Sequence, residues 1–285
     1  MIIDFSQRRR FFSLYSTSPG CLLDEEGWYS VTPELIADQI AERCRCDTIL
    51  DAFCGVGGNS IAFAKTCQRG KPYMFKRFVP YLLIYSTVIA LDTSPTRLAL
   101  ARHNAQIYGV ADRIEFILSD YLSFAKSYLS LPSLSKPQTE NSHQLEMRKI
   151  DVVFLSPPWG GPSYLAGSDD DISDLTQSAS QVAPNPLPSS GHPSYSLSLI
   201  QPIHGAQLFA LTRRITRNVA FYLPRNTQLD EVSALLSEES TREQHQNGEG
   251  TVATEQVEVE EEWMGTKLKA LTCYFGGLVT GQEGF

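Results

Sequence analysis

The sequence lacks the features that mark metal-binding, membrane and secreted proteins. Its six cysteines and five histidines show no metal-ligand spacing, because Cys44-x-Cys46 has no second pair or histidine cluster beside it. The most apolar run, 78–91, contains Pro80 and polar residues and is too short to cross a bilayer. No signal peptide opens the chain. We therefore expect no bound metal, no membrane association and free thiols in a reducing compartment.

A strong excess of basic residues is also missing. The formal net charge is −8, but residues 230–262 alone hold eleven acidic residues and one arginine, a net of −10. The remaining chain carries 23 basic and 21 acidic residues, a net of +2. A nearly neutral protein can bind a few phosphates through local arginine clusters, such as those at residues 8–10 and 213–217. It lacks the positive charge needed to bind along a nucleic-acid duplex. This balance favours an RNA end or a small phosphorylated ligand over DNA.

The order of apolar segments predicts an α/β fold. At 285 residues, 42% hydrophobic and 20% charged, the chain can bury one good core. Strands are expected at 48–53, 87–91, 113–118, 151–155, 218–224, 257–260 and 270–275. Helical patterns between the earlier strands indicate a Rossmann-like, doubly wound sheet, which the last two strands close as an antiparallel pair. Ligands of such sheets bind at the carboxyl ends of the strands, near the topological switch point.

We divide the chain into two parts. Residues 1–46 are expected to form a small N-terminal helical extension that closes over the ligand site, and 47–285 to form the sheet domain. Stretches rich in Ser, Pro or acidic residues predict loop insertions in the sheet domain, near 67–86, 127–148, 180–198 and 237–256.

The segment 151–162 joins a buried strand to an abrupt stop. After the apolar run come Ser156, two prolines, Trp159 and two glycines. Prolines fix φ and leave carbonyls outside the strand ladder, so that acceptors face the strand end. Ser156, the Pro157 carbonyl and Trp159 would then cradle a planar group that carries an NH2. This fits the signature of methyltransferases that act on exocyclic or amide nitrogens, although a simple proline-rich turn is the alternative for these four residues alone.

A glycine-rich loop follows the first predicted strand. The pattern Asp51-x-Phe53-x-Gly55-x-Gly57 departs from the Gly-x-Gly-x-x-Gly dinucleotide fingerprint, because it begins with an acid. The glycines permit a tight turn and close backbone approach to a ligand. The carboxylate would repel a pyrophosphate, but it suits the cationic amine and sulfonium of S-adenosylmethionine.

Two more acids end the next two strands. Asp92 is placed to accept hydrogen bonds from both ribose hydroxyls, and Asp120 from the adenine amine. A turn or cap role is the alternative for either acid alone. Three strand-end acids in register with a glycine loop favour S-adenosylmethionine as the cofactor.

The expected chemistry is positioning rather than strong base catalysis. An aromatic amine is a poor nucleophile, and acceptors at Ser156 and Pro157 could turn its nitrogen towards tetrahedral geometry. Trp159 can stack on a base, worth about 1–3 kcal/mol. A cationic base such as 7-methylguanine would add a cation–π interaction of about 0.5–2 kcal/mol. Core packing is the alternative role for Trp159.

Several segments together resemble the methyltransferase domain of the trimethylguanosine synthase family, which methylates RNA cap guanosine at N2. They are GWYSVTPE at 27–34, DAFCGVGGN at 51–59, ARHNA at 101–105, SPPWGGP at 156–162, FYLPRN at 221–226, and KLK and YFG at 267–269 and 274–276. The resemblance implies an enzyme that uses S-adenosylmethionine to convert 7-methylguanosine caps of small nuclear and nucleolar RNAs to the 2,7-dimethyl and 2,2,7-trimethyl forms. We expect it to be a monomer in the nucleus, at nucleolar or Cajal-body-like sites, with the cytoplasm as a further location.

The same resemblance implies a role for each matched residue. Trp159 would stack on 7-methylguanine, Ser156 and Pro157 would line the reacting amine, and Asn104 would contact the base. The implied cofactor contacts are Phe12, Ser30, Thr32, Asp51, Phe53, Gly55, Gly57, Asp92 and Asp120, and the implied cap-phosphate contacts are Tyr164, Arg225, Lys267 and Lys269.

Two other functions stay open at this stage. One is an amino-methyltransferase acting on adenine or guanine inside RNA, which would not need the positive charge that Trp159 reads. The other is a catalytically inactive RNA-cap-binding module that keeps the fold, which would bind S-adenosylmethionine without turnover.

Overall fold

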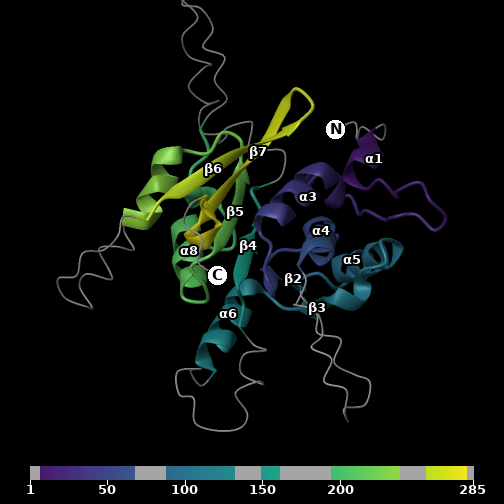
Figure 1. Cartoon of the computed structure of the whole chain (residues 1–285), viewed down its shortest axis with the longest axis horizontal. Helices are drawn as coiled ribbons and strands as arrows, with labels where there is room; N and C mark the ends of the chain where they lie inside the picture. The colour runs from purple at the N-terminus through teal and green to yellow at the C-terminus, as the bar shows by residue number, and fades with distance from the viewer. Residues whose placement is uncertain (1–6, 68–87, 132–148, 161–193, 238–254, 281–285) are drawn as a thin grey trace, which may run out of the picture.

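The fold is built on a seven-stranded sheet in the order β3-β2-β1-β4-β5-β7-β6 (Figure 1). The computed structural model describes residues 7–67, 88–131, 149–160, 194–237 and 255–280. Its strands are β1 Ile49–Asp51, β2 Val88–Asp92, β3 Ile114–Leu118, β4 Val152–Leu155, β5 Val219–Pro224, β6 Val257–Met264 and β7 Lys267–Phe275. The first five are parallel, and β7 runs antiparallel between β5 and β6. The predicted antiparallel closing pair is confirmed.

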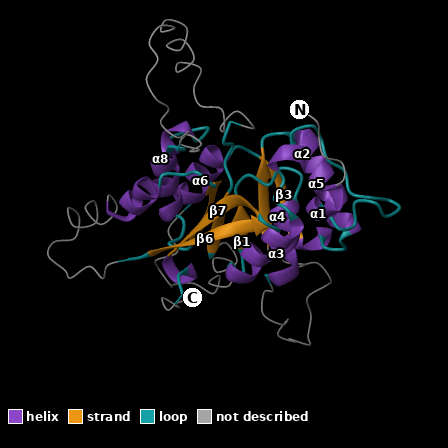
Figure 2. Cartoon of the chain, turned by 90° about the horizontal axis from the view of Figure 1, so that it is seen from above, coloured by secondary structure: helices purple, strands orange, loops and turns teal. Residues whose placement is uncertain are grey.

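Helices cover both faces of this sheet (Figure 2). The α-helices include α1 Arg8–Phe11, α2 Gly27–Ser30, α3 Glu34–Arg43, α4 Gly58–Thr66, α5 Pro95–Ile107, α6 Tyr121–Ser130 and α8 Gly205–Arg213. Short 3-10 helices include η2 Ala111–Arg113, η6 Leu197–Leu199 and η7 Gly276–Leu278. Side chains of α3, α4 and α5 share one core with the sheet, and those of α6 and α8 share the other. The doubly wound, Rossmann-like α/β fold is therefore as predicted.

The continuous apolar run of β4 follows from burial on two faces. All four of its residues are buried. Val152 and Phe154 enter the core beneath α3 to α5, while Val153 and Leu155 enter the core beneath α6 and α8. A strand covered on both sides has no polar face, so it shows no apolar–polar alternation in its sequence.

The strand order puts the candidate residues at one edge of the sheet. The chain runs outward through β1, β2 and β3 and then crosses back to β4, so the switch point lies between β1 and β4. Beyond β1, the Ala52 amide donates to the Phe154 carbonyl (3.1 Å) and the Cys54 amide to the Leu91 carbonyl (2.8 Å). Because β7 is antiparallel to β5, its first residues lie at this same carboxyl edge. Ligands of doubly wound sheets bind there.

The N-terminal segment contains little helix before α2, although basic and aromatic residues over 1–20 form the pattern of an amphipathic helix. In the described part of 1–20, only Arg8–Phe11 form an α-helix. The Ser13 amide donates to Glu34 Oε2 (2.5 Å) rather than to a helical carbonyl. The rings of Phe11 and Tyr15 instead pack on Trp28, with centroids 6.2 and 5.6 Å away. Contacts distant in sequence therefore override the local helical pattern.

One helix was missed by the sequence interpretation. Residues 127–130, assigned to the loop insertion 127–148, belong to α6. Asp120 caps this helix, because its Oδ1 accepts from the Ser123 amide (2.8 Å). Tyr195 and Leu197, at the end of the predicted insertion 180–198, are buried. The other parts of the predicted insertions, 68–86, 132–148, 180–193 and 238–254, lie outside the described residues.

A buried glutamate on β6 makes the stability of the fold depend on pH. Glu262 accepts a hydrogen bond from the Thr272 hydroxyl (2.5 Å), and its Oε2 has no hydrogen-bond partner within the described ranges. Burial, together with the nearby charge of Glu260, raises the pKa of Glu262 to about 7. The folded state therefore holds this proton more tightly than the unfolded state. The resulting stabilisation is complete below the unfolded pKa and is lost as pH rises through the folded pKa.

We expect Glu262→Gln to raise the free energy of unfolding by about 1–3 kcal/mol at about pH 8 and to change it little at about pH 5. The amide keeps an acceptor for Thr272 and removes the buried charge. Denaturant unfolding at the two pH values measures the difference. Glu261→Gln, at the exposed neighbour, is the control. An equal effect of Glu262→Gln at both pH values would contradict the assignment.

Candidate active site

The glycine loop after β1 leaves its backbone open to a ligand. Gly55 and Gly57 have φ of 53° and 91°, the left-handed region that favours glycine. A Cβ at Gly57 would lie 3.0 Å from the Ala101 Cβ, so α5 packs closely on the loop. A Cβ at Gly55 would meet none of the described atoms within 4 Å. Gly55 is therefore the position where a ligand can approach the backbone.

Two carboxylates flank this loop. Asp92 accepts from the Gly55 amide through Oδ2 (3.1 Å) and from the Ser94 amide through Oδ1 (2.7 Å). Asp51 is fully buried, and its Oδ2 accepts from the Ser60 hydroxyl (2.6 Å). No described residue donates a hydrogen bond to Asp51 Oδ1. A buried acceptor without a donor is costly, so this oxygen fits a ligand that brings a donor.

The electrostatics of Asp51 fit a cationic ligand. Burial raises the pKa of Asp51 to about 7, and the charge of Asp92 raises it as well, against the hydrogen bonds from Ser60 and the Phe53 amide. A positive group beside this carboxyl would favour its ionised form. Asp51 and the Gly55 backbone are thus the residues that would hold S-adenosylmethionine, whose sulfonium supplies an activated methyl group.

The N-terminal segment is tied to the same loop. The Thr32 hydroxyl accepts from Asn59 Nδ2 (2.9 Å), and a Cβ at Gly58 would lie 3.0 Å from Val31 Cγ2. Thr32 does not cap α3, whose N-cap is Pro33. Ser30, which is exposed, donates to the Glu26 carbonyl (2.9 Å). Contact of Ser30 and Thr32 with the cofactor stays a prediction, and it agrees with their place beside the loop.

Asn104 has a structural role as well as a predicted contact with the base. Its side chain accepts from the Leu22 amide (2.7 Å) and donates to the carbonyls of Leu22 (2.9 Å) and Val56 (3.0 Å). It is also fully buried. Asn104 therefore joins the N-terminal segment to the glycine loop, and its contact with the base stays a prediction.

Two predicted cofactor contacts also have structural roles. The side chain of Phe12 is 2% exposed, with its ring centroid 6.1 Å from that of Tyr108. Asp120 is exposed at the end of β3, where its bond from the Ser123 amide holds the pKa of the carboxyl below its usual value. Neither role tests the cofactor contact directly, so both contacts stay predictions.

The Ser-Pro-Pro-Trp turn lies against the glycine loop. The Ser156 hydroxyl donates to the Phe53 carbonyl over a long 3.4 Å, and Phe53 itself packs on Tyr121. Pro157 is buried, and the Trp159 ring is partly buried. The Trp159 ring centroid lies 5.2 Å from that of Tyr222 on β5, with an interplanar angle of 32°. Tyr222 thus supports an indole that keeps some exposure, as a stacking platform requires.

Three cations meet at the same edge of the sheet. Arg225 follows β5 directly and donates to the Leu268 carbonyl (3.4 Å). Burial, and then the charges of Lys267 and Arg225, lower the pKa of Lys269. An anion beside these like charges would favour their ionised forms. The fourth predicted phosphate contact, Tyr164, lies outside the described residues.

Sequence reasoning missed two supporting residues. Ser60 holds Asp51, and Tyr222 backs Trp159. Ser60 follows the glycine loop near the start of α4, and Tyr222 lies inside the FYLPRN segment. Their positions next to or within the matched motifs could have identified both residues. Within the described residues, no group of three or more His, Cys, Asp or Glu side chains could hold a metal ion. No helix in that same part is long and apolar enough to cross a membrane.

The strand order, the open glycine loop and the buried acceptor of Asp51 together define a class of protein. The chain is an S-adenosylmethionine-dependent methyltransferase of Rossmann-like fold. Within that class, the family model described as RNA cap guanine-N2 methyltransferase matches residues 46–183 and 189–278. The chain belongs to this family, and it is an enzyme that methylates cap guanine at N2. The family match does not favour the internal-base and inactive-module alternatives.

Two relatives agree with this assignment. Trimethylguanosine synthase of Schizosaccharomyces pombe is 33% identical over 241 residues, which cover 81% of this chain and 73% of the relative. Trimethylguanosine synthase of Saccharomyces cerevisiae is 31% identical over 234 residues, covering 80% of this chain and 56% of the relative. The chain thus spans a little over half of the second relative.

Solved structures are more distant. An O-methyltransferase of Bacillus cereus, in complex with SAH, is 10% identical, with a TM-score of 0.44 and coverage of 95% of this chain and 90% of that chain. The fold assignment rests on the strand order and not on this likeness.

Proposed function

We propose that the chain methylates N2 of 7-methylguanosine caps twice in succession, giving the 2,7-dimethyl and then the 2,2,7-trimethyl form. The observation that supports this most is the tilted packing of the Trp159 ring against Tyr222, beside the Ser156–Phe53 contact. It offers a supported aromatic face next to hydrogen-bond acceptors, at the edge where the cofactor residues lie. Trp gives the largest cation–π interaction of the aromatic residues, which suits a base made positive by 7-methylation.

The proposed roles follow from this arrangement. Trp159 holds the base plane, while the Ser156 hydroxyl and the Pro157 carbonyl accept hydrogen bonds from the exocyclic amine and aim its lone pair at the methyl donor. The amine has two hydrogens, and each transfer replaces one of them. A first product still offers one hydrogen to these acceptors, and a second product offers none. The site therefore stops at two additions.

The capped small nuclear and nucleolar RNAs are the proposed substrates, and the nucleus is the proposed location. We also propose that the enzyme acts as a monomer. The low net charge outside 230–262 supports recognition of an RNA end by a few phosphate contacts rather than of a long duplex. Mass spectrometry of the cap released from methylated RNA tests the product, with two added methyl groups expected at completion. A product that stays at one added group in excess S-adenosylmethionine would refute the second addition.

The cations Arg225, Lys267 and Lys269 are proposed to hold the cap phosphates. We expect Arg225→Ala and Lys269→Ala each to raise KM for the capped substrate by about tenfold, the value of one charge-assisted contact. Each should also reduce the slope of log affinity against log salt by about 0.7. Initial rates at low and moderate salt measure both effects. Lys126→Ala, at an exposed lysine of α6, is the matched control, and an unchanged salt slope in the two variants would exclude phosphate contacts here.

A further inference from the structure

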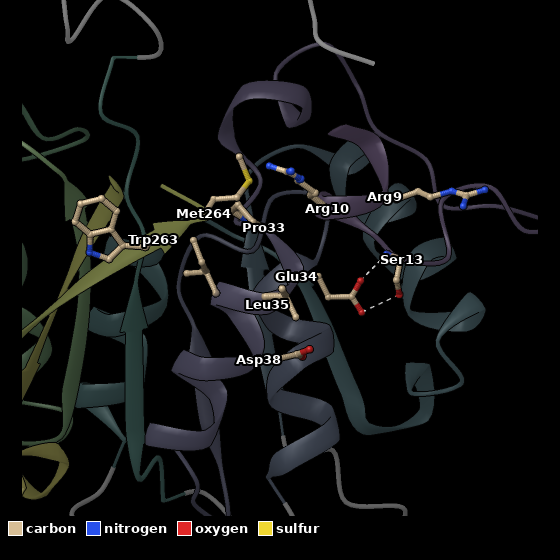
Figure 3. Close-up of a pocket in the computed structure, with 11 residues that line it drawn as sticks. Arg9, Arg10, Ser13, Pro33, Glu34, Leu35, Asp38, Trp263 and Met264 are labelled. Atoms are coloured by element: carbon tan, nitrogen blue, oxygen red, sulfur yellow. Dashed lines mark hydrogen bonds between the residues drawn. The ribbon is translucent and has the colours of Figure 1, made fainter. Parts of the chain in front are cut away.

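A cavity of about 550 Å³ lies between the N-terminal segment and the β6–β7 turn (Figure 3). Its walls include Arg10 of α1, Leu35 and Asp38 of α3, and Trp263 and Met264 of β6. Ligand pockets commonly measure about 300–1,000 Å³. None of the proposed catalytic, cofactor or cap-phosphate residues lines this cavity, so it is a separate feature.

The acidic groups of the cavity are partly neutralised by the protein. Glu34 accepts from the Tyr108 hydroxyl (2.9 Å) as well as from Ser13, as Figure 3 shows for Ser13. Lys65 lies 3.3 Å from Glu34 and 3.2 Å from Asp38, forming ion pairs with both. The two acids and the lysine keep one net negative charge, which the two arginines that line the cavity outweigh.

The basic groups, in contrast, are available. Arg9 and Arg10 are exposed, and neither forms an ion pair with any residue in the described ranges. In Figure 3, Arg10 points across the cavity towards Met264, whereas the Arg9 side chain extends away from it. Arg10 is therefore the cation that an occupant would meet.

Two large apolar side chains are exposed at the rim. Leu35 is 83% exposed and Trp263 is 50% exposed. The Trp263 indole nitrogen donates to Glu261 Oε2 (3.1 Å), which restricts the ring. Exposed apolar side chains that gather at a cavity are a feature of binding sites, whereas single exposed apolar residues are common on any surface. An aromatic ring and an arginine that line one cavity are groups that bind single-stranded nucleic acid, because bases stack on the ring and phosphates pair with the cation.

The position of the cavity indicates which part of an RNA would reach it. Gly265 lines the cavity and lies in the turn between β6 and β7. Met264, also in the lining, pairs with Lys267 in the sheet register. Lys267 is one of the proposed cap-phosphate contacts. The cavity thus adjoins the site proposed for the cap phosphates, where the RNA chain beyond the cap must emerge.

We propose that this cavity binds the first nucleotides that follow the cap, with Trp263 stacking on a base and Arg10 pairing with a phosphate. The inference rests on the proposed function of the cap site and extends it to the RNA body. Such binding would give a capped RNA a higher affinity for the enzyme than the isolated cap nucleotide has. Charge complementarity and the exposed indole favour RNA as the occupant over a protein segment.

Two substrates with the same cap test this proposal. One is 7-methylguanosine triphosphate, which has no following nucleotides, and the other is a short single-stranded RNA with a 7-methylguanosine cap. Trp263→Ala and Arg10→Ala are each expected to raise KM for the capped RNA by about tenfold, in the range of one lost stacked base. KM for the mononucleotide and kcat for both substrates should stay at their wild-type values. Trp263→Phe keeps a stacking face and should restore most of the affinity.

Controls come from the surface far from the cavity. Arg45→Ala removes an exposed arginine beyond the end of α3, and Leu199→Ala removes a side chain that is 55% exposed. Both should leave KM for the capped RNA unchanged. Thermal unfolding of each variant shows whether the fold is intact, and the exposure of Trp263 and Arg10 predicts that it is.

The outcomes separate the inference from the proposed function. An equal loss on both substrates would place the cavity within the cap site and overturn the inference, as would no loss on either. If the wild-type enzyme methylated neither substrate, the proposed function would fail. Equilibrium binding of a fluorescently labelled form of the capped RNA to the same variants would then still decide the inference. Weaker binding by Trp263→Ala and Arg10→Ala would sustain it, and affinities equal to that of the wild-type protein would overturn it.

Discussion

Replacing Trp159 with alanine is expected to lower kcat/KM for a 7-methylguanosine cap by about 100-fold. Loss of base stacking removes about 1–3 kcal/mol, and loss of the cation–π interaction removes about 0.5–2 kcal/mol more. Each 1.4 kcal/mol is a factor of ten. Because the Trp159 ring packs against Tyr222 at a centroid distance of 5.2 Å, the indole is partly ordered before a substrate binds.

Two further variants isolate the role of charge. Trp159→Phe keeps a stacking face with a weaker cation–π interaction, so its loss should be intermediate. Neither variant should change the affinity for S-adenosylmethionine, because Trp159 belongs to the base side of the site. Steady-state kinetics with 7-methylated and unmethylated caps measure these effects. The account predicts that Trp159→Ala loses most of its discrimination between the two caps. Retained discrimination would assign Trp159 to core packing.

Replacing Asp51 with asparagine is expected to weaken S-adenosylmethionine binding by about 30-fold or more. The carboxylate has one buried oxygen without a donor in the described structure, and a cationic amine would meet it there. Charge-assisted hydrogen bonds are worth about 1.5–3 kcal/mol, and an amide keeps the shape but not the charge. Methyl transfer should fall by at least the same factor at limiting cofactor.

The pH dependence of cofactor binding provides a second test of the role of Asp51. Burial and the charge of Asp92 raise the pKa of Asp51 to about 7 in the free protein. S-Adenosylmethionine affinity should therefore increase as pH rises from about 6 to about 8, because the ionised carboxylate attracts the cation. The free protein, in contrast, loses the stability that the protonated carboxyl provides over the same range. Cofactor binding should offset this loss.

Isothermal titration calorimetry across this range tests the assignment. Asp51→Asn should bind with an affinity that is nearly independent of pH. Ser60→Ala removes the hydroxyl that donates to Asp51 Oδ2 at 2.6 Å, so it should move the midpoint to higher pH without abolishing binding. Wild-type affinity in Asp51→Asn, or an unmoved midpoint in Ser60→Ala, would show that another group binds the cation.

Local patterns in the sequence predicted the parts of the fold that depend on local chemistry. The apolar run at 151–155 predicted the buried strand β4. The carboxylate of Asp51, directly before the glycine loop, predicted a ligand with positive charge. Each of these features is decided by residues adjacent in the chain, so the sequence alone could show it.

Other features depend on partners that are distant in sequence. The side-chain amide of Asn104 donates to the carbonyls of Leu22 and Val56, which are 82 and 48 positions away, a structural role that the sequence did not reveal. Asp120 was interpreted as a ligand contact, but the same residue also caps α6, and that helix was missed. The cavity beside Trp263 combines three separate segments. No local pattern could have predicted it.

The central claim is that this site reads a positively charged cap base and methylates its N2. Radiolabelled methyl transfer from S-adenosylmethionine, measured side by side on RNA with a 7-methylguanosine cap and on the same RNA with an unmethylated cap, tests it most directly. The account predicts label on the 7-methylated cap alone. Equal labelling of the two caps would contradict it.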